Sequence, residues 1–276
     1  MARSPATPLR KALRRVKGEP QLVAPQDQTG GNGRAQKIPR HVFQTAEGRE
    51  VHHLHGRSIE AFRSLNPDLS FTLFDRKARD SYMEENWGHH KIHSVYERAV
   101  FGQMRADVFR YCILFDQGGY YFDYNKGCSK QLTQLHPPEA SALITAESNP
   151  ELLFPDPHLA ELLENPFNLY AQWGFGFSQG HPILKLAIER IVAIEPFFRD
   201  KIFQNPKKAL LTLSATGLFT SVVRSFFINQ GTEDVHQAGI DFNGHGIFRL
   251  RGAKILLNHP HHYSRVENSP IVVSPT

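Results

Sequence analysis

The stretch from Asp107 to Gly127 constrains the fold most, because it joins a helix to a strand that ends in polar side chains. An amphipathic helical pattern stops at Gly118-Gly119, and paired glycines there are typical of a helix C-cap and turn. The aromatic run 120–122 predicts a short buried strand that leads into Asp123 and Asn125. Alternate residues of a strand face the same side, so we expect both oxygens to reach one ligand. A carboxylate and an amide oxygen suit a hard divalent cation carrying phosphate oxygens, which is the chemistry of a nucleotide-sugar site.

The order of strand and helix patterns predicts an α/β fold. We expect strands at 39–45, 71–74, 120–124, 142–146, 173–178, 246–250 and 254–257. We expect helices at 51–65, 76–87, 94–116, 182–194 and 208–228. Strands that alternate with helices imply one Rossmann-like, mostly parallel sheet with helices on both faces.

The positive charge of the chain is confined to its first residues. Eight basic and two acidic side chains give residues 1–37 a net charge of +6, which leaves −1 for the remainder of a chain whose total is +5. A nucleic-acid-binding domain carries its basic footprint on the fold itself, so this class is disfavoured. We expect residues 1–37 to be a disordered basic tail and residues 38–276 to form the folded domain. Within the tail, residues 8–17 fit either a basic amphipathic helix on anionic lipid or a solvated segment.

Two features bear on cellular location. The only cysteines, Cys112 and Cys128, form no disulfide framework, and reduced thiols fit the cytoplasm. The apolar stretch from Leu210 to Ile228 is interrupted by polar residues and resembles a buried helix more than a membrane span. We therefore expect a cytoplasmic protein, or one peripheral to the inner face of the membrane.

Several runs resemble one enzyme family. The block from Arg105 to Tyr111 and the block from Gly118 to Asn125 are similar to the sugar-binding region of DXD glycosyltransferases. That family includes yeast-type initiating mannosyltransferases, bacterial capsule and lipopolysaccharide transferases, and the catalytic domains of glucosylating toxins. The run 38–45 looks like the family's first strand, and residues 66–75 are similar to its second strand.

The resemblance implies a GT-A fold and transfer of a sugar from a nucleotide-diphosphate donor with retention of configuration. The acceptor would be a glycan, a lipid-linked sugar or a polysaccharide. The catalytic residues would be Asp107, Arg110, Asp123 and Asn125. Contacts to the donor would come from Gln44, Thr45, Asp107, Arg110, Gly119, Tyr121 and Lys126. A divalent metal, Mn²⁺ or Mg²⁺, would be held by Asp123 and Asn125, with His261 as a third contact.

The chain departs from the family pattern at three positions. Asn125 replaces the second acid of the motif, so the site has one negative charge fewer and an amide oxygen would bind the cation more weakly. Lys126 follows directly and could supply part of the positive charge near the diphosphate. In the first strand, Phe43 and Ala46 stand where the family often has His and Trp.

Each assignment has a structural alternative. Asp107 and Arg110, at i and i+3, could form a surface ion pair, and Asp123 could simply end a strand in a turn. Trp173 could stack on an acceptor sugar or lie in the core, and Gly217 could pack closely or approach a ligand. His261 belongs to a group with His259 and His262 that could also be a surface cluster. Two other functions fit parts of the pattern: a sugar-nucleotide-binding protein weakened by Asn125, and a glycoside hydrolase, which needs paired carboxylates.

Overall fold

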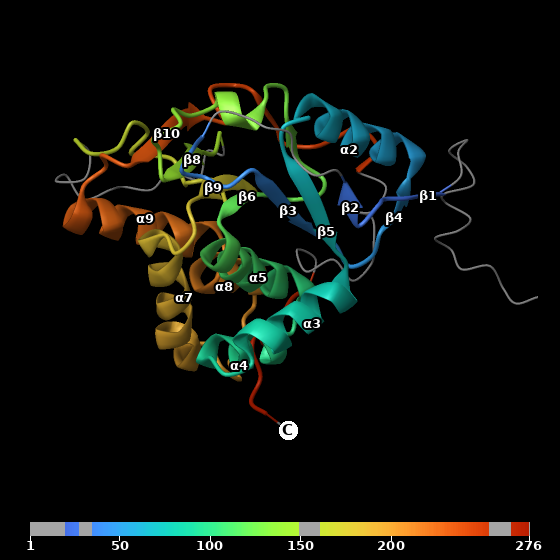
Figure 1. The fold of residues 1–276 in the computed structure, drawn as a ribbon. Coiled ribbons are helices and arrows are strands. Elements are labelled where there is room, and N and C mark those ends of the chain that lie inside the picture. The colour runs from blue at the N-terminus through green and yellow to red at the C-terminus, as the bar shows by residue number, and fades with distance from the viewer. Residues whose placement is uncertain (1–19, 28–34, 149–160, 254–265, 276) are drawn as a thin grey trace, which may run out of the picture.

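A computed structural model describes residues 20–27, 35–148, 161–253 and 266–275. Its centre is a seven-stranded sheet in the order β10-β8-β9-β6-β3-β5-β2 (Figure 1). These strands are β2 Gln26–Asp27, β3 His41–Thr45, β5 Ser70–Phe74, β6 Gly119–Phe122, β8 Ala142–Ala146, β9 Gly174–Phe177 and β10 Val235–Ile240. Within this sheet β9 and β2 run against the other strands. The predicted α/β architecture with a mostly parallel sheet is confirmed.

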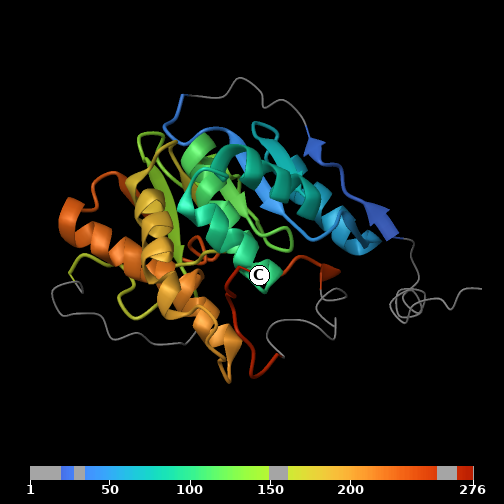
Figure 2. The same cartoon turned by 90° about the horizontal axis from the view of Figure 1, so that it is seen from below.

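Helices cover the sheet on both faces. They are α2 His53–Leu65, α3 Arg76–Trp87, α4 Lys91–Arg98, α5 Gly102–Gln117, α7 Pro182–Ile194, α8 Pro206–Leu213 and α9 Thr216–Gln230, with short 3-10 turns η1 Leu132–Gln134 and η2 Glu195–Phe197. In Figure 1, α2 lies on one side of the sheet and α3, α4, α5 and α7 lie on the other. Seen from below, this second group faces the reader, and the C-terminal end of the chain lies over it (Figure 2).

Alternation along the central strands separates two apolar cores. Phe43 on β3 and Tyr121 on β6 belong to the larger core beneath α5, α7 and α9. Their neighbours Val42, Tyr120 and Phe122 face the opposite side and pack with the ring of Phe62 from α2. A period of two along each strand therefore buries both faces, as a covered sheet requires.

Residues 20–27 correct the expected boundary of the folded domain. β1 Pro20–Leu22 pairs with β4 Glu50–His52, and β2 adds an antiparallel edge to β5. Edge pairing depends on backbone hydrogen bonds and needs no strong apolar pattern, which is why composition placed these residues in the tail. The expected helix at 8–17 and the expected strand at 254–257 lie outside the described residues.

Four expected elements differ at their ends or interiors. The strand expected over 246–250 is the two-residue strand β11 Gly246–Ile247, which pairs with β7 Gly127–Cys128. The helix expected over 94–116 is two helices, because the chain is extended at Ala99, which forms an antiparallel bridge with Val272. The helix expected over 208–228 is also two, separated at Ser214 and Ala215. The strand expected over 120–124 ends at Phe122, because the chain turns there and the Lys126 amide donates to the Asp123 carbonyl at 2.8 Å. The last two breaks shape the site described below.

The most apolar helical segment belongs to the core. By length and hydropathy alone, Pro206–Gln230 is the one stretch among the described helices that could cross a membrane, and half of its most apolar window is buried. Leu210, Phe219 and Val223 lie in the larger core. The segment is also interrupted between α8 and α9. It is part of the core, as the sequence predicted.

Candidate active site

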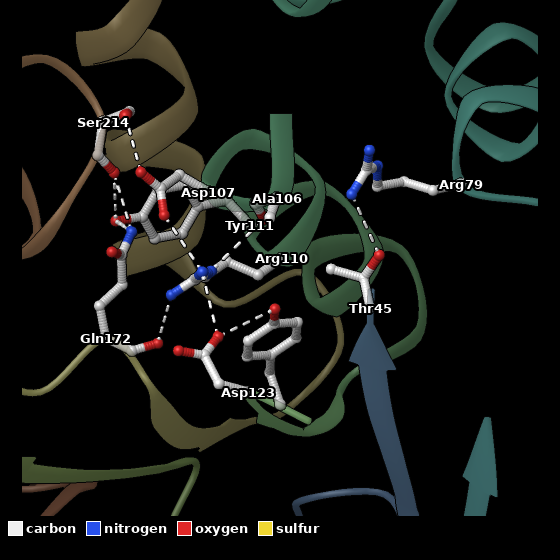
Figure 3. A network of polar contacts seen from close by, with 10 residues as sticks. Thr45, Arg79, Ala106, Asp107, Arg110, Tyr111, Asp123, Gln172 and Ser214 are labelled. Atoms are coloured by element: carbon white, nitrogen blue, oxygen red, sulfur yellow. Dashed lines mark hydrogen bonds and ion pairs between the residues drawn. The ribbon is translucent and has the colours of Figure 1, made fainter. Parts of the chain in front are cut away.

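Arg110 is the centre of a buried charge network at the carboxyl edge of β6 (Figure 3). One of its terminal nitrogens lies 3.1 Å from Asp107 Oδ1 and 3.3 Å from Asp123 Oδ1. The other donates to the Gln172 carbonyl at 2.7 Å. Its guanidinium carbon lies 4.7 Å from the centre of the Tyr121 ring. The pair that could have been a surface contact is buried, since Asp107 is 6 % exposed and Arg110 is 5 % exposed.

The turn between α5 and β6 brings these groups together. α5 ends at Gln117 and Gly118 has φ +63°, so the chain reverses into β6 within two residues. α5 then runs back along the strand, which sets Asp107 and Arg110 beside the carboxyl end of β6, where Asp123 follows Phe122. Carboxyl edges of strands are where open α/β sheets bind ligands.

Ser214 completes the surroundings of Asp107. Its hydroxyl donates to Asp107 Oδ2 at 2.9 Å, and its carbonyl accepts from Gln172 Nε2 at 2.8 Å. Burial raises the pKa of Asp107 to about 6, against the opposing effects of Arg110 and Ser214. The carboxyl group is therefore ionised in most molecules at pH 7 and gains a proton near pH 6. Sequence reasoning missed Ser214 and Gln172; the signal for Ser214 was the polar interruption of the apolar stretch 210–228.

Asp123 presents one oxygen to the protein and one outward. Oδ1 accepts from Arg110 and from the Tyr121 hydroxyl, each at 3.3 Å. No described residue donates a hydrogen bond to Oδ2, and 29 % of the side chain is exposed. The backbone amide donates to the Trp173 carbonyl at 2.8 Å, which fixes the start of the turn. Asp123 is thus held in place with a carboxylate oxygen available to a ligand.

Asn125 lies in the turn rather than on an extended strand. The strand alternation expected for Asp123 and Asn125 is therefore wrong, because β6 has already ended. Asn125 Oδ1 is buried and accepts no hydrogen bond from the described residues. A buried oxygen without a donor is costly unless a ligand satisfies it. This orphaned oxygen and Asp123 Oδ2, two residues apart in the chain, are both of the kind that a hard divalent cation prefers.

Lys126 adds a buried cation beside the carboxylate. The residue is 8 % exposed, and its Nζ lies 3.2 Å from the centre of the Phe248 ring. Burial lowers the pKa of Lys126 to about 8, while the charge of Asp123 acts in the opposite direction. The ammonium is therefore charged in most molecules at pH 7 and loses its proton in mildly alkaline solution. Phe248, which sequence reasoning also missed, is 55 % exposed and covers this ammonium.

The depressed pKa of Lys126 predicts a pH-dependent stability. The folded pKa of about 8 lies below the ordinary value of 10.5, so the unfolded chain binds more protons between these values. Stability should rise with pH across that window, and the full penalty is present below pH 8. Lys126→Met should raise the free energy of unfolding at pH 7 by about 1–3 kcal/mol and flatten the rise. Urea unfolding from pH 7 to 10 measures both effects. The control is Lys185→Met, at a side chain that is 64 % exposed; identical curves for Lys126→Met and wild type would refute the buried ammonium.

The expected donor contacts of the first strand lie at the same edge. β3 and β6 pair in parallel with Phe43 opposite Tyr121. The same register, continued by two residues, places Thr45 at the level of Asp123. Thr45 Oγ1 donates to the Phe74 carbonyl at 2.9 Å and accepts from Arg79 at 3.3 Å. Gln44 is buried, and neither atom of its amide has a partner among the described residues. Tyr121 is buried beneath Arg110, so it supports the network from below.

A shallow, open depression of about 510 Å³ lies beyond the ends of β3 and β5. Its lining is Glu47, Gly48, Asp75, Arg76, Lys77, Asp80 and Ser81. Arg79 connects it to the first strand, because its guanidinium reaches Glu47 at 3.0 Å as well as Thr45. The ends of parallel strands therefore adjoin both this depression and the charged motif.

Gly119 does not join the other predicted site residues. It begins β6, whereas Asp123 follows the opposite end of the strand. Its φ is +102°, and a Cβ there would lie 2.5 Å from the His41 carbonyl oxygen. Its position does not support a contact to the donor, and the close approach of β3 explains the glycine.

The backbone at Gly119 gives a stability prediction. Gly119→Ala should lower the free energy of unfolding by about 2–4 kcal/mol, because it combines a left-handed φ with a backbone clash. Gly48→Ala is the matched control: no atom lies within 4 Å of a Cβ there, and its effect should stay within about 0.5 kcal/mol. Chemical unfolding of the two variants decides the question, and equal stabilities would contradict the role of Gly119.

The other candidate site residues either serve packing of the fold or lie outside the described residues. Trp173 is buried and packs edge-on against Phe122 and Phe242, as the core alternative expected. A Cβ on Gly217 would lie 2.7 Å from the Leu211 carbonyl oxygen, so close packing of α8 and α9 explains this glycine. His261, with its neighbours 259 and 262, lies outside the described residues.

A second cluster of potential metal ligands lies on α3 and α4. His93 Nε2 is 3.2 Å from Glu84, and its Nδ1 is 3.7 Å from Glu97. One ligand atom from each of the three residues lies within 4.8 Å of the others. This arrangement is that of a bridge between the two helices, and both acids are largely exposed.

Comparison with known proteins finds similarity in the central part of the chain. Residues 53–142 match the family described as glycosyltransferase sugar-binding region containing DXD motif. The similarity to this glycosyltransferase family thus covers about a third of the chain. The matched region holds α5, the paired glycines, and the motif from Asp123 to Asn125.

Two curated yeast mannosyltransferases are similar to parts of the chain. Inositol phosphoceramide mannosyltransferase 1 of Schizosaccharomyces pombe is 28 % identical over 112 residues, which cover 40 % of this chain and 34 % of that protein. Initiation-specific alpha-1,6-mannosyltransferase of the same yeast is 24 % identical over 201 residues, or 68 % of this chain and 48 % of that protein. The chain thus spans about a third to a half of the length of these relatives. A solved structure titled PaToxG Glycosyltransferase has a TM-score of 0.49 and 12 % identity, covering 82 % of this chain and 76 % of that one.

Proposed function

We propose that this protein is a glycosyltransferase that moves a sugar from a nucleotide-diphosphate donor to a glycan, lipid-linked or polysaccharide acceptor. The observation that carries the proposal is the buried Asp107–Arg110–Asp123 network at the carboxyl edge of β6, inside the region that matches a glycosyltransferase family. A buried network of charges is costly to a fold and is characteristic of functional sites.

Each residue of the site would have its own role in binding the donor. Arg110 fixes Asp123 through Oδ1, so that Oδ2 faces the ligand. Asp107, oriented by Arg110 and Ser214, would accept hydrogen bonds from hydroxyl groups of the sugar or ribose. Lys126, while protonated, would stabilise negative charge on the departing diphosphate. The nucleoside would occupy the depression beyond β3 and β5.

Asp123 and Asn125 would hold a divalent cation, Mn²⁺ or Mg²⁺. When bound, such a cation offsets the charge of the diphosphate leaving group. The support is the unpartnered Asn125 Oδ1 and the outward Asp123 Oδ2. Because an amide oxygen binds a hard cation less strongly than a carboxylate, Lys126 would carry a larger share of the charge here.

Retention of configuration and cytoplasmic location also belong to the proposal. Retention rests on the family resemblance, and no protein nucleophile is assigned to it. Cytoplasmic location, with peripheral contact to the inner face of the membrane, rests on cysteine usage and the basic tail. Acceptors of capsule or lipopolysaccharide type would fit such a location.

Asn125→Asp tests the cation directly. The added carboxylate should tighten Mn²⁺ binding by about tenfold, since it replaces a neutral ligand by a charged one. Titration calorimetry with Mn²⁺ in the presence of a nucleoside diphosphate measures the effect. Ser129→Asp, a nearby exposed position, controls for a general increase in negative charge. Unchanged Mn²⁺ affinity in Asn125→Asp would remove Asn125 from the cation site.

Turnover tests the proposed activity. The protein should hydrolyse or transfer sugar from at least one nucleotide sugar when Mn²⁺ is present, and the anomeric configuration of the product should match that of the donor. Binding without turnover for every donor and metal would instead indicate a sugar-nucleotide-binding protein. Hydrolysis of free glycosides without any nucleotide would indicate a glycoside hydrolase.

A further inference from the structure

Residues 196–208, which lead from η2 into α8, expose two large apolar side chains close together. Phe197 is 68 % exposed and Ile202 is 64 % exposed. Isolated apolar residues on a surface need no explanation, but two at the tip of one short segment are a different case. In Figure 2 this segment, in orange, projects at the lower edge beside the red C-terminal segment. We call residues 196–208 the apical loop.

The fold holds the apical loop in a defined shape. The rings of Phe198 and Phe203 are 5.7 Å apart and pack against the larger core. The Lys201 amide donates to the Phe198 carbonyl at 3.3 Å, which closes a turn between the two rings. Because Phe198 and Phe203 face inward, their neighbours Phe197 and Ile202 face outward. The two exposed apolar side chains are therefore presented by a formed turn.

The C-terminal segment fastens the loop from the other side. Phe203 forms a backbone bridge with Ser269, and the Asp200 amide donates to the Val272 carbonyl at 3.0 Å. The Ser274 amide donates to Asp200 Oδ1 at 2.7 Å. Asp200, the one acid of the apical loop, is thus engaged within the fold.

The exposed charged side chains of the apical loop are positive. Lys201, Lys207 and Lys208 are exposed, and none of them forms an ion pair with a residue that the structure describes. Arg199, by contrast, lies 2.6 Å from the buried carboxylate of Glu195. Three unpaired ammonium groups flanking two exposed apolar side chains match the composition of surfaces that bind anionic membranes.

We propose that the apical loop docks on an anionic lipid surface. Phe197 and Ile202 enter the boundary between headgroups and acyl chains, while the three lysines bind the negative headgroups. The loop leads directly into α8, a helix of 8 residues, and α8 is followed by Ser214, which binds Asp107. Eight helical residues span about 12 Å, so the docked surface lies a short distance from the charged network. This orientation would bring a lipid-linked acceptor toward the site.

Vesicle binding of the full-length protein tests the loop. The probes are vesicles of phosphatidylcholine alone and of phosphatidylcholine mixed with phosphatidylserine. The variants are Lys201→Gln/Lys207→Gln/Lys208→Gln and Phe197→Ser/Ile202→Ser. The wild type should bind the mixed vesicles and not the neutral ones. Each variant should bind the mixed vesicles at least about tenfold more weakly. The lysine variant loses binding because each surface lysine contributes about fivefold to the partition. The apolar variant loses binding because it removes the two side chains that enter the membrane boundary.

A control variant separates the contribution of the apical loop to vesicle binding from that of other surface residues. Ile228→Ser/Lys185→Gln changes an equally exposed apolar residue on α9 and a lysine on α7, and should leave vesicle binding unchanged. All variants keep the basic tail, so undiminished binding in both loop variants would assign the membrane contact elsewhere and overturn the proposal. Binding to neutral vesicles that equals binding to mixed vesicles would also overturn it. So would a concentration-dependent dimer, seen by light scattering, that is lost in Phe197→Ser/Ile202→Ser without any vesicle binding by the wild type.

The outcome is independent of the proposed enzyme activity. The loop variants alter no residue of the charged network, so hydrolysis of a soluble donor should be unchanged in them. Loss of vesicle binding with normal hydrolysis supports the docking surface by itself. Absence of hydrolysis in the wild type would challenge the proposed function and leave the vesicle result intact.

Discussion

Asp123→Ala is expected to lower turnover of the donor by at least about 10²–10³-fold, the effect of removing one charge-stabilising group from an active site. The reason is geometric: Arg110 and the Tyr121 hydroxyl hold Oδ1, which leaves Oδ2 without a donor among the described residues and available to a ligand. Steady-state kinetics with Mn²⁺ at a saturating concentration measure the loss. Binding of the metal-bound donor should weaken together with turnover.

Stability should change little in the same variant. Asp123 is partly exposed, and Arg110 keeps its contacts to Asp107 and to the Gln172 carbonyl. The lost hydrogen bonds should cost about 1–2 kcal/mol. Asp234→Ala is a suitable control, because Asp234 forms an exposed ion pair with Lys37 and should affect neither property. An Asp123→Ala protein with wild-type turnover would remove Asp123 from the chemistry.

Arg110→Met is expected to lower the free energy of unfolding by about 3–5 kcal/mol, because it leaves the buried Asp107 carboxylate without its partner. The double variant Asp107→Asn/Arg110→Met removes both charges and should recover a large part of this loss, while remaining inactive. Urea unfolding at pH 8, where Asp107 is ionised, measures the difference between the two variants.

Lower pH offers a second readout of the same pair. The pKa of Asp107 is about 6 even with Arg110 present, so the unpaired acid of Arg110→Met should take up a proton more readily still. The destabilisation in Arg110→Met should therefore shrink toward pH 5. Arg190→Met, at an exposed position on α7, should behave as wild type throughout. If the double variant were as unstable as Arg110→Met at pH 8, an unpaired buried charge could not be the cause.

The central block was predictable because its signals are local. An apolar helical period, paired glycines and an aromatic run fix α5, the turn at Gly118 and the strand β6 from neighbouring residues alone. The parallel arrangement of β3, β5 and β6 followed from the alternation of strands and helices. These elements already bring Asp107, Arg110 and Asp123 to one edge.

The remainder of the site depends on contacts distant in sequence. Ser214 reaches Asp107 only because α8 and α9 break at that point, and helical periodicity alone places no break there. The Gln172 carbonyl reaches Arg110 from the segment just before strand β9, 62 positions away. Phe248, directly after the two-residue strand at 246–247, covers Lys126 from far along the chain. Such contacts are set by packing of the whole chain, so the local sequence signals a polar interruption at Ser214 but not the partner that it contacts.

Calorimetric titration of nucleotide sugars into the wild-type protein and into Asp123→Ala, each with and without Mn²⁺, tests the central claim most directly. The account predicts that at least one nucleotide sugar binds the wild type more tightly with Mn²⁺ than without it, and that Asp123→Ala loses this enhancement. Equal affinities with and without the cation in both proteins, or no binding of any nucleotide sugar, would contradict it.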